Sequence, residues 1–531
     1  MILPKNFPVT AKILSRIPRA ISETCFNYFK NPLRIPAIVW GQSQELGMVK
    51  QLSPLTGQPC AEYALADHYT ITKTLAHYKR PSSTSRLDFA SHLLKTSAFL
   101  ASGKYHDSLL AATIVGQGKT YRQAQVDVAE LIDFWNFNSY YLQQIKSIQP
   151  VYPSRTAECG QFFNQIEYLP LNGLTAAITP FNFTAIGANL SSLPAVLGNP
   201  TIWKPSDNAV LSNYIVYKIL IEAGLEPDLL SFLPSDPSHF TDVIKHKDLA
   251  ALAFTGSTRT FNHLSQQIYN DIESRNHYPR LIGETGGKNF SFLDESCDLE
   301  MASREIFLSA FEYSGQKCSA CSVVYLPKSL LSKFLDQMKV ISSNYRHLVS
   351  NPLDKQVVSP LTGPLINSEA LKKYHRYLDQ AKNHSATDEI IFLSGRHESP
   401  QTAGYYAPLT IVVSRDSNFP LFQDEIFGPI LTIYPYDEDQ SSDELADQLC
   451  QSSPYALTGA VFSRDLEKIE KYKELFAHQA GNFYVNVKCT GSVVGQQPFG
   501  GPMKSGTNDK AGGLTFPLRF LNSRTIKERL D

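Results

Sequence analysis

The sequence predicts an α/β protein with two doubly wound domains, because short β-rich runs alternate with helical patterns in two successive series. The strand-like runs of the first series are 173–179, 200–204, 229–234 and 249–256, and its helical stretches are 184–197, 209–223 and 258–268. The strand-like runs of the second series are near 322–326, 406–413, 429–436, 457–462 and 481–487. A helical segment at 84–148 should lie on the first domain, and a chain of 531 residues is long enough for such an arrangement.

Composition excludes several classes of partner. Net charge is −1, charged residues are 19% and apolar residues 43%, so no overall field favours nucleic acid or an acidic membrane surface. Small molecules and further copies of the chain are the expected partners. Eight cysteines scattered along the chain are too sparse for a disulfide-stapled secreted domain, which predicts free thiols in a reducing compartment.

The longest uncharged stretch, residues 168–203, is long enough to span a bilayer. Four prolines and four asparagines interrupt it, which favours a buried strand, turn and helix over a membrane span. The first 22 residues are basic and contain no acid, a composition typical of a mitochondrial presequence. An ordinary basic arm is the alternative, so the expected location is the mitochondrial matrix or else the cytoplasm.

The most informative motif is Ser-Gly-Gln-Lys-Cys-Ser-Ala at 314–320, which follows Gly-Glu-Thr-Gly-Gly-Lys at 283–288. A thiolate at Cys318 could act as a nucleophile, and the carboxylate of Glu284 could activate water against the resulting thioester. This pair predicts covalent catalysis on a thiol.

Two other interpretations of Cys318 remain. Free cysteines are commonly buried small hydrophobes, although the polar neighbours Gln316, Lys317 and Ser319 argue against inert burial, and Lys317 could lower the thiol pKa if it points inward. The C-x-x-C spacing to Cys321 is also compatible with zinc or a redox dithiol, but no second C-x-x-C is present to complete a structural zinc site. No metal is expected.

Neither common nucleotide-binding motif is complete. Gly-x-Gly-x-x-Gly is not found near a strand end. Gly-Gln-Gly-Lys-Thr at 116–120 resembles the tail of a Walker A loop, but Thr stands at position 113 where the first glycine is required, and the preceding stretch has a helical pattern. The segment is therefore predicted to be a surface turn.

The paired motifs resemble those of the aldehyde dehydrogenase superfamily, and across most of the chain, from about residue 35, the match narrows to the 1-pyrroline-5-carboxylate dehydrogenase branch. The resemblance implies oxidation of L-glutamate γ-semialdehyde to L-glutamate with NAD, the second step of proline degradation. It assigns nucleophilic attack to Cys318 and water activation to Glu284. The side-chain amide of Asn182 and the backbone N–H of Cys318 would hold the oxyanion.

Three segments resemble the superfamily's NAD site. The resemblance places Lys204 and Ser206 at the adenosine ribose and Gly256 and Ser257 at the pyrophosphate. It also places two residues of 424–429, Glu425 and Phe427, at the nicotinamide ribose and ring. Taken singly, a lysine at a strand end is usually solvated and Gly-Ser before a helix is usually a cap.

The substrate residues follow from a loop at 490–501, Thr-Gly-Ser-Val-Val-Gly-Gln-Gln-Pro-Phe-Gly-Gly, which resembles the branch's anchor loop for the α-carboxylate. The resemblance implies donors from the loop and from the residue after the nucleophile, two aromatic clasps and one acceptor for the ammonium. These residues are Gly491, Ser492, Ser319, Phe183, Phe499 and Glu130. Val487 and Cys489 depart from the branch, which usually has a charged residue at the first position and Ser or Thr at the second. The competing hypotheses are therefore an enzyme that oxidises another small aliphatic semialdehyde and a catalytically silent protein.

The resemblance also suggests a division of the chain. It comprises an N-terminal arm, an NAD-binding domain in two pieces, a catalytic domain that includes the anchor loop, and a small β element that pairs subunits into a homodimer or higher oligomer. The respective residues are 1–34, then 35–148 with 172–283, then 284–505, and finally 149–171 with 506–531.

Overall fold

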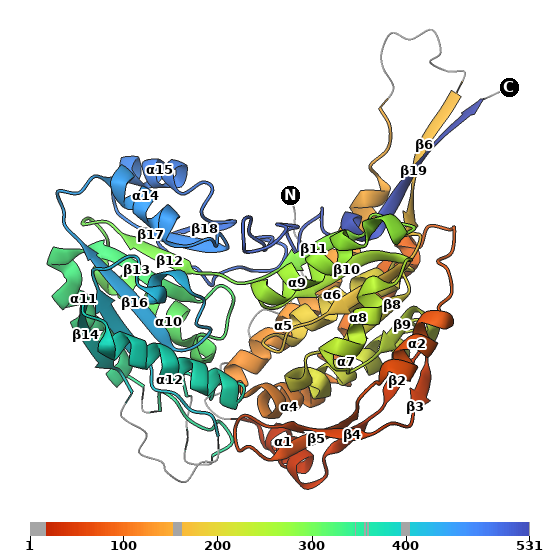
Figure 1. The fold of residues 1–531 in the computed structure, drawn as a ribbon, viewed down its shortest axis with the longest axis horizontal. Coiled ribbons are helices and arrows are strands. Elements are labelled where there is room, and N and C mark those ends of the chain that lie inside the picture. Colours follow the sequence, from red (N-terminus) through yellow and green to blue (C-terminus); the bar gives the residue numbers. More distant parts are fainter. Residues whose placement is uncertain are drawn as a thin grey trace.

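The computed structural model describes residues 17–151, 162–345, 347–354, 357, 360–394 and 404–529. Two lobes, each built on a seven-stranded sheet, lie side by side, and a two-stranded arm projects from one of them (Figure 1). Two doubly wound α/β units with a small β element were predicted, and this architecture is confirmed.

The sheet of the first lobe has the order β11-β10-β7-β8-β9-β2-β3. Its strands are β11 (Arg280–Glu284), β10 (Leu249–Thr255), β7 (Leu174–Ile178), β8 (Thr201–Lys204), β9 (Leu230–Phe232), β2 (Ala37–Val39) and β3 (Gln42–Gln44). The first five are parallel, while β2 and β3 extend the sheet with antiparallel pairing that the sequence did not predict.

Helices cover both faces of this sheet, and neighbouring residues of each strand point to opposite faces. Ala177 and Trp203 pack under α3 to α7, while Ala176 and Ile202 pack under α2, α8 and α9. The helices of this lobe are α1 (Arg19–Lys30), α2 (His68–Ala76), α3 (Leu87–Ser102), α4 (His106–Gln117), α5 (Tyr121–Lys146), α6 (Thr184–Val196), α7 (Val210–Glu222), α8 (Pro237–Lys245) and α9 (Thr258–Asn270).

The N-terminal region contributes more to this lobe than an arm would. Helix α1 buries Ile21 and Cys25 in the same core cluster as α4, so this part of the predicted 1–34 arm is packed on the globular body. A three-stranded sheet, also not predicted, follows in the order β1 (Leu33–Ile35), β5 (Pro59–Ala64), β4 (Met48–Leu52). Residues 1–16, which hold most of the presequence-like composition, lie outside the described residues.

The sheet of the second lobe has the order β14-β15-β16-β13-β12-β17-β18, all parallel except β14. Its strands are β14 (Thr387–Phe392), β15 (Thr410–Ser414), β16 (Ile430–Tyr436), β13 (Cys321–Pro327), β12 (Asn289–Leu293), β17 (Thr458–Phe462) and β18 (Asn482–Val485). Its helices are α10 (Leu299–Phe311), α11 (Leu331–Ser343), α12 (Ser368–Asn383), α13 (Pro420–Gln423), α14 (Ser442–Ser452) and α15 (Leu466–Leu475). Short 3-10 turns in the two lobes are η1 (Asp207–Ala209), η2 (Pro227–Leu229), η3 (Ile272–Ser274), η4 (Glu312–Gly315), η5 (Lys328–Leu330) and η6 (Pro517–Phe520).

One predicted strand is shorter than expected. The run 406–413 becomes a strand only at β15, which begins at Thr410. The residues before it have other partners, since the Tyr406 hydroxyl donates to the Leu55 carbonyl and the Leu409 N–H donates to the Ser394 hydroxyl. A backbone N–H bound to a side chain in this way does not donate to a neighbouring strand.

The projecting arm consists of β6 (Phe162–Pro170) and β19 (Leu521–Arg529), paired antiparallel over their whole length (Figure 1). The segment 506–520 does not belong to the arm. Its Thr507 N–H donates to the Gly283 carbonyl, and Phe516 and Phe520 are buried in the core of the first lobe. Residues 152–161 of the predicted β element lie outside the described residues.

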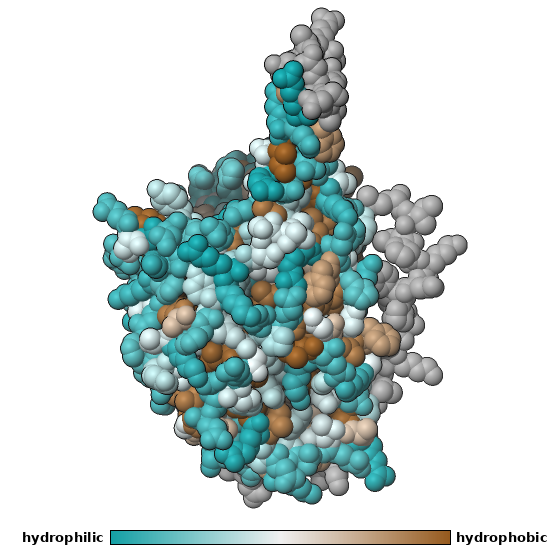
Figure 2. Space-filling view, turned by 90° about the vertical axis from the view of Figure 1, so that its right-hand side faces the viewer, coloured by the Kyte–Doolittle hydropathy of each residue, from teal (hydrophilic) through white to brown (hydrophobic). Residues whose placement is uncertain are grey.

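No helix in the described ranges is both long and apolar enough to cross a bilayer. The face seen in Figure 2 is mostly hydrophilic, and its hydrophobic residues are scattered singly or in small groups.

Candidate active site

A cavity of about 590 Å³ lies between residues of the two lobes. The first lobe contributes Phe183 and Glu284 to its wall, and the second contributes Cys318 and the 490–499 loop. The predicted nucleophile, the predicted base and the predicted substrate loop therefore face one space.

The loop that carries Cys318 is sharply turned. Tyr313, Ser314 and Gly315 follow α10 with φ of 55°, 54° and 68°, a left-handed run that is costly for the two non-glycine residues. The Asn289 side chain then donates to the carbonyls of Cys318 and Ala320 at 2.7 and 2.8 Å. These contacts fix the backbone around Cys318, just before β13 begins.

The surroundings of the Cys318 thiol favour its neutral form. Burial raises its pKa, and the carboxyl groups of Glu284 and Glu425 raise it further. The Lys317 ammonium does not oppose this, because it binds Glu312 at 2.8 Å, so the suggestion that Lys317 lowers the thiol pKa is wrong.

Glu312 is the centre of a small ion cluster in the cavity wall. Burial disfavours its charge, but the ammonium groups of Lys317 and Lys488, at 2.8 and 3.4 Å, outweigh burial and lower the Glu312 pKa to about 2. This cluster joins the nucleophile loop to the root of the anchor loop. This ion cluster was not predicted from the sequence, because the two lysines are far apart in the chain.

Glu284 stands at the carboxyl end of β11 and lines the same cavity as Cys318. Burial raises its pKa to about 8, Asp509 adds to the shift, and Lys510 opposes it. A carboxyl group with such a pKa can take up and release a proton near neutral pH.

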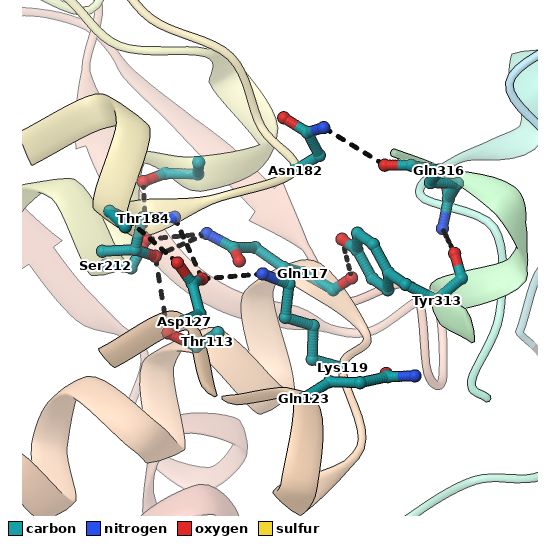
Figure 3. A network of polar contacts seen from close by, with 12 residues as sticks. Thr113, Gln117, Lys119, Gln123, Asp127, Asn182, Thr184, Ser212, Tyr313 and Gln316 are labelled. Atoms are coloured by element: carbon teal, nitrogen blue, oxygen red, sulfur yellow. Dashed lines mark hydrogen bonds and ion pairs between the residues drawn. The ribbon is translucent and has the colours of Figure 1, made fainter. Parts of the chain in front are cut away.

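Asn182 is buried beside the nucleophile loop, where its side-chain N–H donates to the Gln316 carbonyl at 3.1 Å (Figure 3). Its amide nitrogen carries a second hydrogen, so the group can still donate to another acceptor. Its Oδ1 has no hydrogen-bond partner within the described part of the chain.

All of the predicted substrate residues line the cavity: Glu130, Phe183, Ser319, Gly491, Ser492 and Phe499. Glu130, on α5, is not a solvated helix charge, since burial and then Asp127 raise its pKa to about 7. Within the loop, the Ser492 hydroxyl donates to the Gln497 carbonyl at 2.8 Å.

The two departures from the branch pattern differ in their surroundings. Val487 is 40% exposed. Cys489 is buried, with its sulfur 3.1 Å from the Ser309 hydroxyl and 3.4 Å from the Ser319 carbonyl. Cys321 is likewise buried, 3.2 Å from the Ser291 hydroxyl, and the described residues contain no cluster of three or more metal-ligating side chains.

The predicted cofactor residues lie outside the wall of this cavity. Lys204 ends β8, Ser206 follows it, and Gly256 and Ser257 follow β10, so all four stand at the carboxyl edge of the first sheet. Ser257 caps α9 by accepting from the Thr260 N–H. Lys204 is buried, which lowers its pKa, and no hydrogen bond or ion pair of its ammonium is found among the described residues.

Glu425 and Phe427 connect this edge to the nucleophile loop. Glu425 accepts from the Gly287 N–H at 3.0 Å, and the neighbouring Gly286 N–H donates to Thr258 at the start of α9. The ring of Phe427 meets that of Phe181 edge-on at 5.9 Å, next to Asn182.

The prediction of a surface turn at residues 116–120 is wrong. The Gly-Gln-Gly-Lys-Thr segment is buried between α4 and α5, not a surface turn, and Lys119 lines the cavity. Lys119 is 1% exposed and binds the 0% exposed Asp127 at 2.7 Å. A Thr120 to Gln123 capping box indicates that the segment joins two helices, but the burial of the lysine depends on α6 and the nucleophile loop packing over it.

Comparison with known proteins agrees with this geometry. A model described as the aldehyde dehydrogenase family matches residues 40–526. With its paired thiol and carboxyl between two α/β lobes, the chain belongs to the aldehyde dehydrogenase family.

Several of its relatives are named delta-1-pyrroline-5-carboxylate dehydrogenase. Delta-1-pyrroline-5-carboxylate dehydrogenase, mitochondrial, of Homo sapiens is 40% identical over 504 residues, covering 93% of this chain and 86% of that protein. The protein of that name from Emericella nidulans is 38% identical over 522 residues, covering 96% and 89%. A crystal structure of the Delta-pyrroline-5-carboxylate dehydrogenase from Mycobacterium tuberculosis has a TM-score of 0.86 and 31% identity, covering 100% and 97%. A Thermus 1-pyrroline-5-carboxylate dehydrogenase with bound NAD has a TM-score of 0.87 and 27% identity, covering 100% of both chains.

Proposed function

We propose that the protein oxidises L-glutamate γ-semialdehyde, formed from 1-pyrroline-5-carboxylate, to L-glutamate with NAD, the second step of proline degradation. The observation that carries this proposal is the single cavity lined by Cys318, Glu284 and all six predicted substrate residues. The names of the relatives support the same substrate. A catalytically silent protein would have no use for this complete set.

The reaction begins when the Cys318 thiol gives its proton to solvent water and the resulting thiolate attacks the aldehyde carbon, so that the carbonyl oxygen becomes an oxyanion. Asn182 donates its remaining amide hydrogen to that oxygen, together with the Cys318 backbone N–H. When bound, NAD supplies the hydride acceptor that the oxidation requires. Glu284 then removes a proton from the water that hydrolyses the thioester on Cys318, which releases glutamate.

Lys204, Ser206, Gly256, Ser257, Glu425 and Phe427 fit the cofactor. The Lys204 ammonium has no partner among the described residues and is available to ribose hydroxyls, and Ser257 stands at the start of α9, where N–H groups suit a pyrophosphate. Glu425 is held by Gly287 and can accept from the second ribose. Asp207 lies close enough to Lys204 to affect its pKa, which disfavours the 2′-phosphate of NADP.

The substrate assignment predicts a selective effect of Ser492→Ala. The KM for glutamate semialdehyde should rise about tenfold, the equivalent of one hydrogen bond of about 1.4 kcal/mol. The reason is that the lost hydroxyl, which donates to the Gln497 carbonyl in this structure, would turn to donate to the α-carboxylate of a bound substrate. The KM for propionaldehyde, which has no carboxylate, should stay unchanged. Ser147→Ala, which removes a similar hydroxyl-to-carbonyl bond from an exposed site, is the matched control. Equal turnover of succinate semialdehyde and glutamate semialdehyde by the unaltered protein would contradict the assignment.

The arm formed by β6 and β19 is proposed to pair subunits into a homodimer or higher oligomer, because its two strands project from the first lobe, β19 is mostly exposed, and an edge strand can pair with a strand of another chain. Truncation after Asn522 should lower the mass measured by sedimentation to that of a smaller species. It should leave Tm nearly unchanged, because β19 is mostly exposed. An unaltered sedimentation mass would place the subunit contact elsewhere.

A mitochondrial location is proposed from the basic N-terminus and from the relatives whose names include that compartment. Fusion of residues 1–22 to a fluorescent protein tests it, and a cytoplasmic signal would favour the ordinary basic arm.

A further inference from the structure

The buried pair formed by Lys119 and Asp127 has no part in the chemistry proposed above, yet it lies between the segment that carries Asn182 and the turn with Tyr313 and Gln316 that precedes the nucleophile (Figure 3). An ion pair this deeply buried is costly to desolvate and is weak evidence for stability alone. Its contacts indicate what it does.

Asp127 completes the start of α6. The residue before this helix is Phe183, which has no side chain able to cap it. The Asp127 carboxylate, reaching across from α5, accepts from the Thr184 N–H at 3.0 Å and from the Ala185 N–H at 2.9 Å. A carboxylate at a helix N-terminus satisfies free donors and interacts favourably with the helix dipole. Because Asn182 and Phe183 directly precede these residues, their backbone is fixed by the same contact.

Lys119 connects that contact to the nucleophile loop. Its ammonium binds Asp127 at 2.7 Å and lies 4.1 Å from the centre of the Phe183 ring and 5.0 Å from that of Tyr313. Tyr313 belongs to the left-handed turn before Cys318, and its hydroxyl donates to the Gln117 carbonyl at 2.8 Å.

Two further hydrogen bonds complete the network. The Gln117 side chain donates to the Thr184 hydroxyl at 2.9 Å, and the Asn182 amide donates to the Gln316 carbonyl. The start of α6 and the turn before Cys318 are thus held against the same short segment between α4 and α5.

We propose that Lys119 and Asp127 are positioning residues, which set the separation and orientation of the Asn182 amide relative to the Cys318 sulfur. The inference rests on the proposed function, because it takes Asn182 as the oxyanion donor. Asp127 acts on α6 directly, and Lys119 acts by neutralising Asp127 and by contacting the two aromatic rings.

Three isosteric variants test the pair: Asp127→Asn, Lys119→Met and the double variant. Asp127→Asn should lower kcat about 10²-fold for both glutamate semialdehyde and propionaldehyde, with KM changed less than about threefold, because a misplaced donor affects the transition state rather than ground-state binding. Lys119→Met should have a smaller effect on kcat, because the carboxylate still binds α6. In the double variant Tm should recover relative to Asp127→Asn while kcat stays low.

The matched control is Asp294→Asn, which disrupts another buried carboxylate bound to a lysine, Lys468, away from the cavity. It should lower Tm without lowering kcat. If kcat follows Tm in every variant and recovers in the double variant, the pair is structural and the proposal is overturned. If Lys119→Met is the more damaging change and raises only the KM for glutamate semialdehyde, Lys119 binds substrate instead.

The test of the Lys119 and Asp127 pair can be decided even if the substrate assignment is wrong. If the unaltered protein oxidises propionaldehyde but not glutamate semialdehyde, the assignment fails, and the kcat values with propionaldehyde still decide the role of the pair. The iodoacetamide alkylation rate of Cys318 provides a readout without any aldehyde. It should change more in Asp127→Asn than in Asp294→Asn if the pair positions the loop, and equal rates would count against the proposal.

Discussion

Replacement of Cys318 by alanine is expected to abolish NADH formation with every aldehyde, a loss of at least about 10³-fold, because no other group in the cavity can form the thioester. Loss of one partly buried sulfur should leave the fold intact. The measurement is NADH absorbance with 1-pyrroline-5-carboxylate and with propionaldehyde, alongside Tm and NAD binding. NAD binding should persist, since the predicted cofactor residues lie outside the cavity wall that holds the thiol.

Cys297→Ala is the matched control, because Cys297 is also a free, partly buried cysteine but does not line the cavity. It should retain full activity. Substantial turnover by the Cys318 variant would remove the covalent mechanism, and an inactive unaltered protein that still binds NAD would favour a silent member of the family.

Glu284→Gln is expected to separate the two halves of the reaction. The amide cannot accept a proton from water, so NADH should form in a burst of about one equivalent and then continue about 10²- to 10⁴-fold more slowly than in the unaltered protein. Rapid mixing with quantification of the burst measures both phases. Loss of the burst together with the slow phase would place Glu284 in the first half of the reaction instead.

The pH dependence of thioester hydrolysis in the unaltered protein follows from the Glu284 pKa, which burial raises to about 8. Only the ionised carboxylate is a base, so hydrolysis should be slow below this pH, rise through it and level off above it. Glu284→Gln should lose this rise. Glu273→Gln, an exposed carboxyl outside the cavity, should preserve it.

Strands β7 to β10 of the first sheet and β13 and β15 to β18 of the second were predicted, because their apolar runs alternate with helical patterns, whereas β11, β12 and β14 were not. The runs that became β8, β10 and β16 match the structure closely. The antiparallel additions β2 and β3 were not predictable, because strands of three residues carry no periodicity and form only where β9 offers an open edge.

The sequence by itself determined the class of chemistry, since the motifs around Cys318 and Glu284 supply a thiol and a carboxyl group, and the resemblance of the 490–501 loop to the anchor loop of the branch implies a carboxylate site. Tertiary structure alone decided their electrical state and support. Lys317 turns to Glu312 instead of the thiol, burial raises the pKa of Glu284 to about 8, and Lys119 is buried on Asp127. Each of these depends on which distant segments exclude water from a group and which opposite charge they bring to it. Such burial and pairing are properties of packed surfaces that a local motif does not encode.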